Sequence, residues 1–322
     1  MNRIFSYLFV AIAAFGFSFT ITAQDDYVNA VWVLNEGVQD WNTGEMVELA
    51  SVGVYDPVSQ MLTEVMEFEG SRFTTDIVVA EGSAFIGADN KIVKMNLNTF
   101  EIEAEVLLQG VRQLAYFDGM IYVTRGDYDP VTFGSIAFDS YLVWFDAETL
   151  AWAGELPYEI GVGYASEGIS IKEGVAYIAI NNGFEFGQEV GVMGVYDLTT
   201  GEYSEHDLGE DGKNPTHIKV TDQEVLLVNN MDFSSTSLSR VELPSLGAVS
   251  ASVNTVVVGG VLAGCNAAAV LGDELVFQIT SELGMRKASV STLAPSTLTW
   301  GPATDSYYRM ALNPVNGDVY AT

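Results

Sequence analysis

Short polar groups that could bind a small molecule precede several apolar segments of this chain. Their side chains include Arg112, Glu167, His217, Asn266 and Arg309. A guanidinium presents paired N–H donors, so Arg112 and Arg309 could together hold an anionic group. The alternative is that both arginines hydrogen-bond neighbouring parts of the fold. For His217 and Asn266, we predict hydrogen bonding to neighbouring parts of the fold and not ligand binding.

The sequence gives weak support for an enzyme, because several common catalytic patterns are missing from it. Its two histidines, His206 and His217, are too few for a three-histidine metal site. It has no G-x-S-x-G nucleophile motif. Its one cysteine, Cys265, lies among small residues in AGCNAAAV, so we expect a buried side chain rather than a nucleophile. These observations predict a protein that is not an enzyme.

A second set of candidate binding residues is aromatic and lies in long polar segments, at 35–50, 125–140, 181–191 and 229–238. Exposed rings of this kind suit a large planar or sugar-like ligand. The alternative is that each ring folds back and pins its own loop. The predicted ligand-binding residues are Trp41, Arg112, Tyr128, Phe133, Phe138, Glu167, Phe184, Phe186, Phe233 and Arg309.

The segments that position these residues repeat along the chain. A short apolar strand, a tight turn and a second strand rich in Tyr and β-branched residues recur at 77–89, 114–126, 169–181, 218–230, 268–280 and 311–322. A second hairpin follows most copies, and after the copy at 268–280 it is expected at 287–303. Its turns, such as DPVSQ, NLNTF, DAETL and DLTTG, open with Asp or Asn, which hydrogen-bonds its own backbone two residues on. The unit is four antiparallel strands in about 45 residues, the period of a β-propeller blade.

We therefore predict an all-β fold, a seven-bladed β-propeller of four-stranded antiparallel blades that is incomplete at its C-terminus. A two-sheet sandwich is the alternative, although its strands would not repeat as a matched set of four. About 30 further residues are expected after Thr322, because the first blade lacks its innermost strand. A natural ring with open edges is the other interpretation. The predicted blades span 30–69, 72–108, 111–157, 165–209, 214–254, 264–304 and, in part, 306–322.

Charge excludes one class of partner. Asp and Glu number 43 against 13 Lys and Arg, which gives a formal net charge of −30. The acidic residues are scattered along the chain, as on a solvated surface. Such a surface repels phosphates and lacks the basic clusters that nucleic-acid binding needs. We therefore predict no nucleic-acid partner.

The N-terminus predicts export. MNR is followed by the apolar run IFSYLFVAIAAFGFSFTI and by ITA, which ends in a small residue before Gln24. This pattern is typical of a secretory signal peptide at residues 1–23, and a membrane anchor is the alternative. No cysteine near that site could accept a lipid, and a single cysteine allows no internal disulfide. We expect a secreted, periplasmic or cell-surface protein built on residues 24–322.

Three phrases resemble a known family. NPVNGDVYAT, VWVLNEG and the pattern D-G-x-I-Y-V-T at 118–124 are similar to YVTN-repeat β-propellers. More narrowly, they resemble the surface propellers of Bacteroidetes that accompany TonB-dependent outer-membrane transporters, one branch of which captures vitamin B12. This resemblance implies nutrient capture, a corrinoid-like ligand and a TonB-dependent transporter as partner. No binding motif of the family matches residue by residue, and this chain lacks the lipid-acceptor cysteine typical of the members that capture B12.

In a propeller, the links between second and third strands share one face with the links between blades, and here those links are long. Binding residues usually lie in long loops on a rigid scaffold. We therefore predict a non-enzymatic propeller without a cofactor that binds a small molecule or glycan. One alternative is a calcium-dependent, lactonase-like hydrolase, with oxygen ligands from Glu167, Asn182 and Asn230. The other is an adhesion propeller whose loop face binds a protein.

Overall fold

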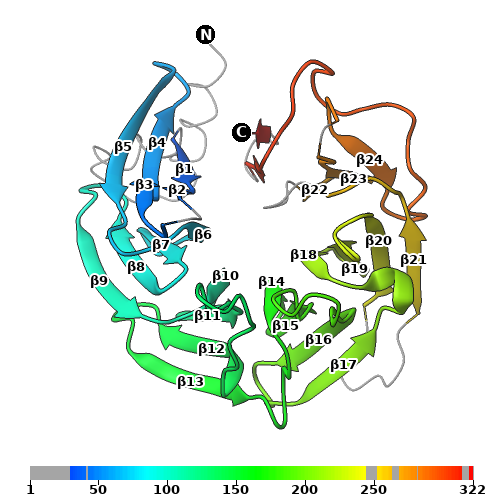
Figure 1. The fold of residues 1–322 in the computed structure, drawn as a ribbon, viewed down its shortest axis with the longest axis horizontal. Helices are drawn as coiled ribbons and strands as arrows, with labels where there is room; N and C mark the ends of the chain where they lie inside the picture. Colours follow the sequence, from blue (N-terminus) through cyan, green and yellow to red (C-terminus); the bar gives the residue numbers. More distant parts are fainter. Residues whose placement is uncertain are drawn as a thin grey trace, which may run out of the picture.

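The computed structural model describes residues 30–40, 43–243, 252–262, 268–280, 282–313 and 319–321. This part of the chain is all-β, with a single 3-10 turn at Glu210–Gly212. Figure 1 shows its sheets arranged around a central axis, as in a β-propeller, and not stacked in two layers as in a sandwich. The predicted signal peptide, Trp41, Cys265 and Asn266 all lie outside the described residues. Within those residues, no helix is long and apolar enough to cross a membrane.

Four consecutive blades each contain four antiparallel strands that neighbour one another in chain order. The first comprises β6 (Thr74–Ala80), β7 (Ser83–Ala88), β8 (Lys91–Asn96) and β9 (Ile102–Leu107). The next comprises β10 (Val111–Phe117), β11 (Met120–Arg125), β12 (Ser140–Asp146) and β13 (Trp152–Pro157). The third comprises β14 (Ser166–Lys172), β15 (Val175–Ile180), β16 (Val192–Asp197) and β17 (Tyr203–Asp207). The fourth comprises β18 (Pro215–Val220), β19 (Glu224–Asn229), β20 (Ser237–Glu242) and β21 (Val253–Val257).

The described sheets at the two ends of the chain are smaller. The N-terminal blade comprises β1 (Val31–Asn35), β4 (Ser51–Asp56) and β5 (Met61–Glu67). A small hairpin in its loop comprises β2 (Val38–Gln39) and β3 (Met46–Glu48). The last blade with three strands comprises β22 (Ala268–Leu271), β23 (Glu274–Phe277) and β24 (Arg286–Ser289). The final hairpin comprises β25 (Met310–Leu312) and β26 (Val319–Ala321).

The described strands match most of the predicted repeat, with one correction. The predicted hairpin over 287–303 does not form a regular fourth strand beside β24. Only isolated bridges join Met285 to Trp300 and Ala288 to Pro295. A proline has no N–H to give to a strand ladder, so Pro295 and Pro302 interrupt the strand that the repeat predicted.

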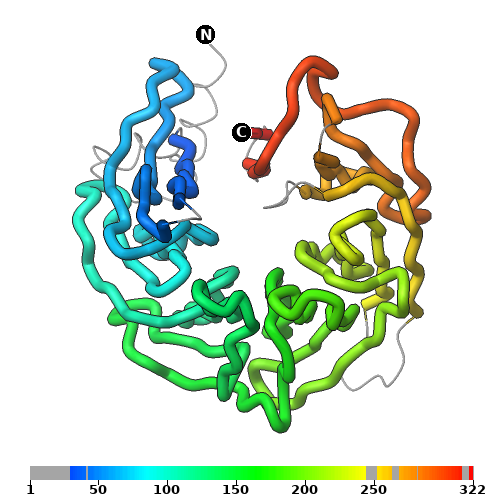
Figure 2. The backbone as a smooth tube through the Cα atoms, in the orientation of Figure 1, coloured from blue at the N-terminus to red at the C-terminus, as the bar shows by residue number. Residues whose placement is uncertain are grey.

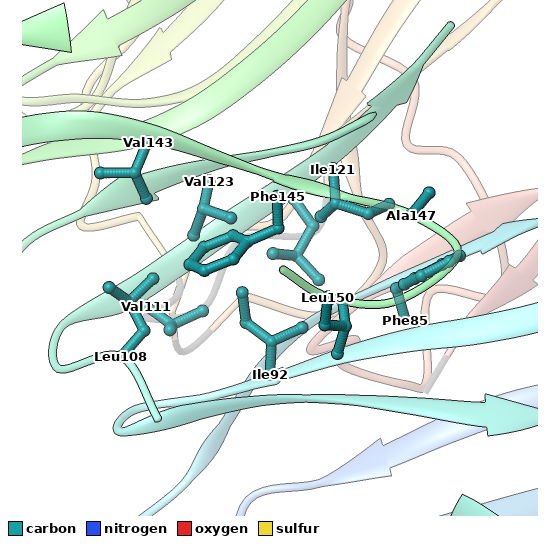
Figure 3. Packing of buried hydrophobic residues seen from close by; sticks show 11 residues of the cluster. Phe85, Ile92, Leu108, Val111, Ile121, Val123, Val143, Phe145, Ala147 and Leu150 are labelled. Carbon is teal, nitrogen blue, oxygen red and sulfur yellow. The ribbon is translucent and has the colours of Figure 1, made fainter. Parts of the chain in front are cut away.

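The hydrophobic core lies between neighbouring blades. Figure 3 shows one such layer, in which Phe85 and Ile92 of one blade meet Ile121, Phe145 and Leu150 of the next. Strands β7 and β15 are buried along their whole length, which explains their continuous apolar runs. Burying a Phe or Ile side chain contributes about 1.5–3 kcal/mol, so each blade is stabilised chiefly by its neighbours.

Tight turns close one face of the ring. Glu81 and Gly82 both have positive φ, and so do Asp118 and Gly119. Two successive residues with positive φ are what a type I′ hairpin turn requires. The predicted Asp and Asn turns are also confirmed. Asp56 Oδ1 accepts the backbone N–H of Val58 at 2.8 Å, and corresponding bonds form in the three later turns that open with Asn96, Asp146 and Asp197.

The tube in Figure 2 brings the C-terminal segment back toward the N-terminal blades. Two hydrogen bonds join them. Tyr308 Oη donates to Glu36 Oε2 at 2.9 Å, and Arg309 Nη2 donates to the carbonyl oxygen of Thr75 at 3.1 Å. The segment just before β25 therefore contributes side chains to the centre of the same ring.

Candidate functional site

The face opposite the tight turns carries a cavity of about 400 Å³. The long links after β11, β15 and β19, at 126–139, 181–191 and 230–236, reach this face, whereas β6–β7 and β10–β11 are joined by two-residue turns. Among the described links on the cavity face, those after β7, at Asp89 and Asn90, and after β9, at 108–110, are short. The asymmetry between the two faces is thus as the sequence predicts.

A bulge at the start of each inner strand supplies polar residues to the cavity. The pairing register shifts between Thr74 and Asp76, Val111 and Leu114, Ser166 and Ile169, and Pro215 and His217. A bulge leaves residues out of the ladder and re-aims their side chains. The skipped residues include four that the site uses: Thr75, Arg112, Glu167 and Thr216.

Aromatic rings from three consecutive loops line the cavity, and we call them the aromatic wall: Tyr128, Phe133, Phe184, Phe186 and Phe233. Tyr128 stacks against both Phe133 and Phe184, each with ring centroids 6.2 Å apart. Phe186 meets Phe233 of the next loop at 5.5 Å. Most of these contacts join different loops, so the rings do more than pin their own segment.

The two predicted arginines are held by neighbouring blades. Arg112 Nη2 lies 2.5 Å from Glu167 Oε1, and its Nε donates to the same oxygen at 2.8 Å. Arg309 donates to the Thr75 carbonyl. Burial raises the pKa of the Asp76 carboxyl, and the positive charge of Arg309 partly lowers it again. Both arginines thus make the hydrogen bonds to other parts of the ring that one of the two interpretations expects, and their binding of an anionic group stays a prediction. All three charged side chains that were predicted as ligand-binding, Arg112, Glu167 and Arg309, line the cavity.

A third arginine, Arg72, supports the aromatic wall, and no sequence pattern pointed to it. Arg72 pairs with Asp89 at 2.5 Å and with Asp127 at 2.7 Å. Its guanidinium carbon lies 4.9 Å from the centre of the Tyr128 ring, and that of Arg112 lies 5.1 Å from the centre of the Phe184 ring. Burial lowers the pKa of Arg72, but the hydrogen bonds and charges of Asp127 and Asp89 outweigh it and raise that pKa above its usual value.

Amide side chains also line the cavity, and sequence reasoning singled out only one of them. Asn181, Asn214 and Asn230 lie beside Thr216. Asn214 is 1% exposed and Asn230 is 8% exposed. Within the described part of the chain, Asn214 Nδ2 and Asn230 Oδ1 are buried without a hydrogen-bond partner. Asn214 also adopts φ of 55°, a conformation that Asn tolerates better than most residues. We call Asn181, Asn214 and Asn230 the amide cluster.

Other predicted residues lie elsewhere. Phe138 does not line the cavity. Its ring lies 3.9 Å from the Arg125 guanidinium carbon and packs edge-on against Tyr141, so it supports its own loop. Asn182 donates to the Gln188 carbonyl in its own loop and is not among the lining residues, unlike Glu167 and Asn230. The predicted calcium ligands are therefore not brought together. Among the described residues there is no group of three or more His, Cys, Asp or Glu that could hold a metal ion.

Asp129 caps its turn, as the backbone N–H groups of Val131 and Thr132 each donate to its Oδ1 at 2.8 Å. These bonds lower the pKa of the Asp129 carboxyl. Asp127 instead faces Arg72 and Gln109. The acidic pair in the loop at 125–140 thus has structural partners, which bring the chain into position around Tyr128.

Comparison with known proteins supports the fold and nothing finer. No protein-family model matches the chain, and no curated protein matches it. Solved structures do. A chain of the mitotic checkpoint complex matches with a TM-score of 0.62 at 10% identity, over 90% of this chain and 87% of that one. The β-propeller domain of Cps50 (Swd1) from Myceliophteria thermophila matches with a TM-score of 0.60 at 10% identity, over 91% and 94%. BamB from Moraxella catarrhalis matches with a TM-score of 0.52 at 10% identity, over 90% and 82%. The chain is similar to these propellers in fold.

Proposed function

We propose that this chain is an exported, non-enzymatic binding propeller that captures a small ligand on its long-loop face. The observation that supports it best is the cavity of about 400 Å³, where the aromatic wall faces a buried amide cluster. This volume lies within the range of about 300–1,000 Å³ common for small-molecule sites. A few fixed polar groups beside apolar rings are the composition expected of such a site.

The proposed biological role is nutrient capture at the cell surface, with a TonB-dependent outer-membrane transporter as partner. It rests on the predicted leader at 1–23 and on the resemblance to YVTN-repeat surface propellers. We also propose seven blades for the scaffold, on the repeat count. A corrinoid is the ligand that the resemblance implies, so cyanocobalamin is one probe in the test below.

Docking of a protein on the same face is the second candidate function. The observation that favours it is the exposure of apolar side chains at the rim, among them Val131, Phe133 and Phe186, which is 74% exposed. A hydrolase receives no comparable support. Glu167 is engaged by Arg112, and Asn182 bonds within its own loop.

The proposal is tested by calorimetric titration of the purified chain with cyanocobalamin, haemin, adenosine and neutral disaccharides. We expect one probe class to bind, and Phe184→Ala to weaken that binding about 5- to 30-fold, because a central aromatic contact contributes about 1–2 kcal/mol. Tyr158→Ala is the matched control, since Tyr158 is a half-exposed ring outside the cavity lining. Binding that Tyr158→Ala and Phe184→Ala weaken equally, or no binding of any probe, would contradict capture in this cavity.

A further inference from the structure

The amide cluster has hydrogen-bonding capacity that the described protein does not use. Asn214 offers a buried donor, Nδ2, and Asn230 offers a buried acceptor, Oδ1, neither of which has a partner among the described residues. A buried polar atom without a partner costs about 1–3 kcal/mol. Native proteins keep such atoms rarely, and a ligand or an ordered water is the usual reason. Both residues line the same cavity.

The charges around the cavity balance. Arg112 is paired with Glu167, and Arg309 acts on the buried carboxylate of Asp76. Among the described lining residues, both arginines therefore already have an acidic neighbour, and the net charge of −30 repels anions from the molecule as a whole. A neutral ligand fits this electrostatic setting.

The rings leave no slot for a flat base. Tyr128 and Phe184 already stack on each other, and so do Tyr128 and Phe133. Phe186 and Phe233 are also in contact. None of these pairs could take an aromatic ligand between its two rings. The wall instead supplies an apolar part of the cavity lining, and the amide cluster supplies a polar part.

We infer that the ligand is a neutral sugar ring, whose apolar C–H face packs against the aromatic wall and whose hydroxyl groups bond to Asn214 and Asn230. A hydroxyl both donates and accepts, so neighbouring hydroxyls satisfy a lone amide donor and a lone amide acceptor together. This inference rests on the proposed capture function and specifies its ligand class.

The test uses calorimetry and saturation-transfer NMR with maltose, cellobiose, lactose and chitobiose, each up to about 10 mM. Glucuronic acid, adenosine and cyanocobalamin serve as the charged, planar and corrinoid comparisons. At least one neutral disaccharide is expected to bind, and glucuronic acid is expected to bind more weakly. Binding of adenosine or cyanocobalamin without any disaccharide would overturn the sugar inference and leave capture in place. If no probe binds, both are overturned.

Two variants separate recognition from structure. Asn230→Ala and Asn214→Gly should each weaken disaccharide binding about 3- to 10-fold, because each removes one hydrogen bond to the sugar. Neither should lower the melting temperature of the free protein, because the deleted amide atoms are unpartnered in it. Glycine also suits the positive φ at Asn214. A fall in melting temperature with unchanged affinity would contradict the inference.

Asn229→Ala is the matched control. Asn229 neighbours Asn230 in the chain, is fully buried, and donates to Ser237 Oγ at 2.9 Å and to Ser239 Oγ at 2.8 Å. It does not line the cavity. Its loss should lower the melting temperature and leave disaccharide affinity unchanged, the opposite of the result expected for Asn230→Ala.

Discussion

Ion pairs join different blades on both faces of the ring, but the pair on the face with the tight turns is exposed, whereas those on the face with the cavity are largely buried. On the turn face, Lys172 pairs with Asp222, which is fully exposed. On the cavity face, Arg72 reaches Asp127, 55 positions away, at 2.7 Å, and Asp127 is 5% exposed. A buried contact of this kind fixes two blades against each other more firmly than an exposed one. The comparison shows why a binding site can be held rigidly on the cavity face.

The largest difference between the faces is expected at their ion pairs. Arg72 is 17% exposed and its partners Asp89 and Asp127 are 6% and 5% exposed. We expect Arg72→Met to lower the free energy of unfolding by about 3–5 kcal/mol, because it leaves two buried carboxylates without a cation. Urea denaturation followed by circular dichroism measures this loss.

Lys172→Met supplies the matched change on the turn face. Lys172 pairs with Asp222 at 2.9 Å, but Asp222 is fully exposed. An exposed pair contributes about 0–1 kcal/mol, so this variant should unfold almost as the parent does. Similar losses for the two variants would remove the distinction between a face with buried ion pairs and a face with exposed ones.

Local chemistry explains how much the sequence could predict. The Asp and Asn turns and the Glu81–Gly82 type of hairpin follow from a few adjacent residues, and the strands between them follow from apolar runs. The long loops and their rings were predictable as a set. Eight of the ten predicted ligand-binding residues line the cavity: Arg112, Tyr128, Phe133, Glu167, Phe184, Phe186, Phe233 and Arg309. Phe138 lies elsewhere, and Trp41 is outside the described residues.

What the sequence did not show depends on contacts between blades. Arg72 lies in a short link with no motif, and its role appears only when Asp127 and Tyr128 are brought beside it. Of the amide cluster, the sequence pointed only to Asn230, as a calcium ligand, and its place beside Asn214 escaped notice because the two belong to links that precede and follow a hairpin. Each bulge shifts the side chains by a residue or more, which no period-two pattern can reveal.

Glycine substitutions sharpen the comparison with a smaller effect. A Cβ at Gly126 would lie 2.7 Å from Phe184 Cε2 and 3.0 Å from Ala165 Cβ. Gly126→Ala should therefore cost about 1–3 kcal/mol by overpacking and should also weaken ligand binding, because it displaces a ring of the aromatic wall. Thermal melts measure the loss of stability, and titration with the disaccharide that binds in the test above measures the loss of affinity.

Gly119→Ala is the corresponding change in a tight turn. Gly119 has φ of 76° and no atom within 4 Å of an added Cβ, so only the backbone conformation is strained. The expected cost is about 1 kcal/mol, without any change in ligand affinity. A loss of affinity in Gly119→Ala would show that the turn face is coupled to the cavity.

The smallest effect is in the pH dependence of two carboxylates. Burial raises the pKa of Asp76 above its ordinary 3.8, although Arg309, the N–H groups of Leu114 and Ile77, and Lys219 all act to lower it. Hydrogen bonds from Thr149 lower the pKa of Asp146 below 3.8. The two groups therefore contribute to stability with opposite sign.

Isosteric variants separate the two contributions, because Asn keeps an acceptor oxygen without the charge. Ionised Asp76 destabilises the folded state, so Asp76→Asn should be more stable than the parent at neutral pH. That advantage should shrink as the pH falls from the raised pKa toward 3.8, where Asp76 is protonated in the native protein. Asp146→Asn should be less stable than the parent above pH 3.8, and the deficit should disappear as the pH falls through the lowered pKa. Urea denaturation from about pH 3 to 8 measures both differences. An advantage for Asp76→Asn that did not depend on pH would mean that packing, and not the buried charge, limits stability at the centre of the ring.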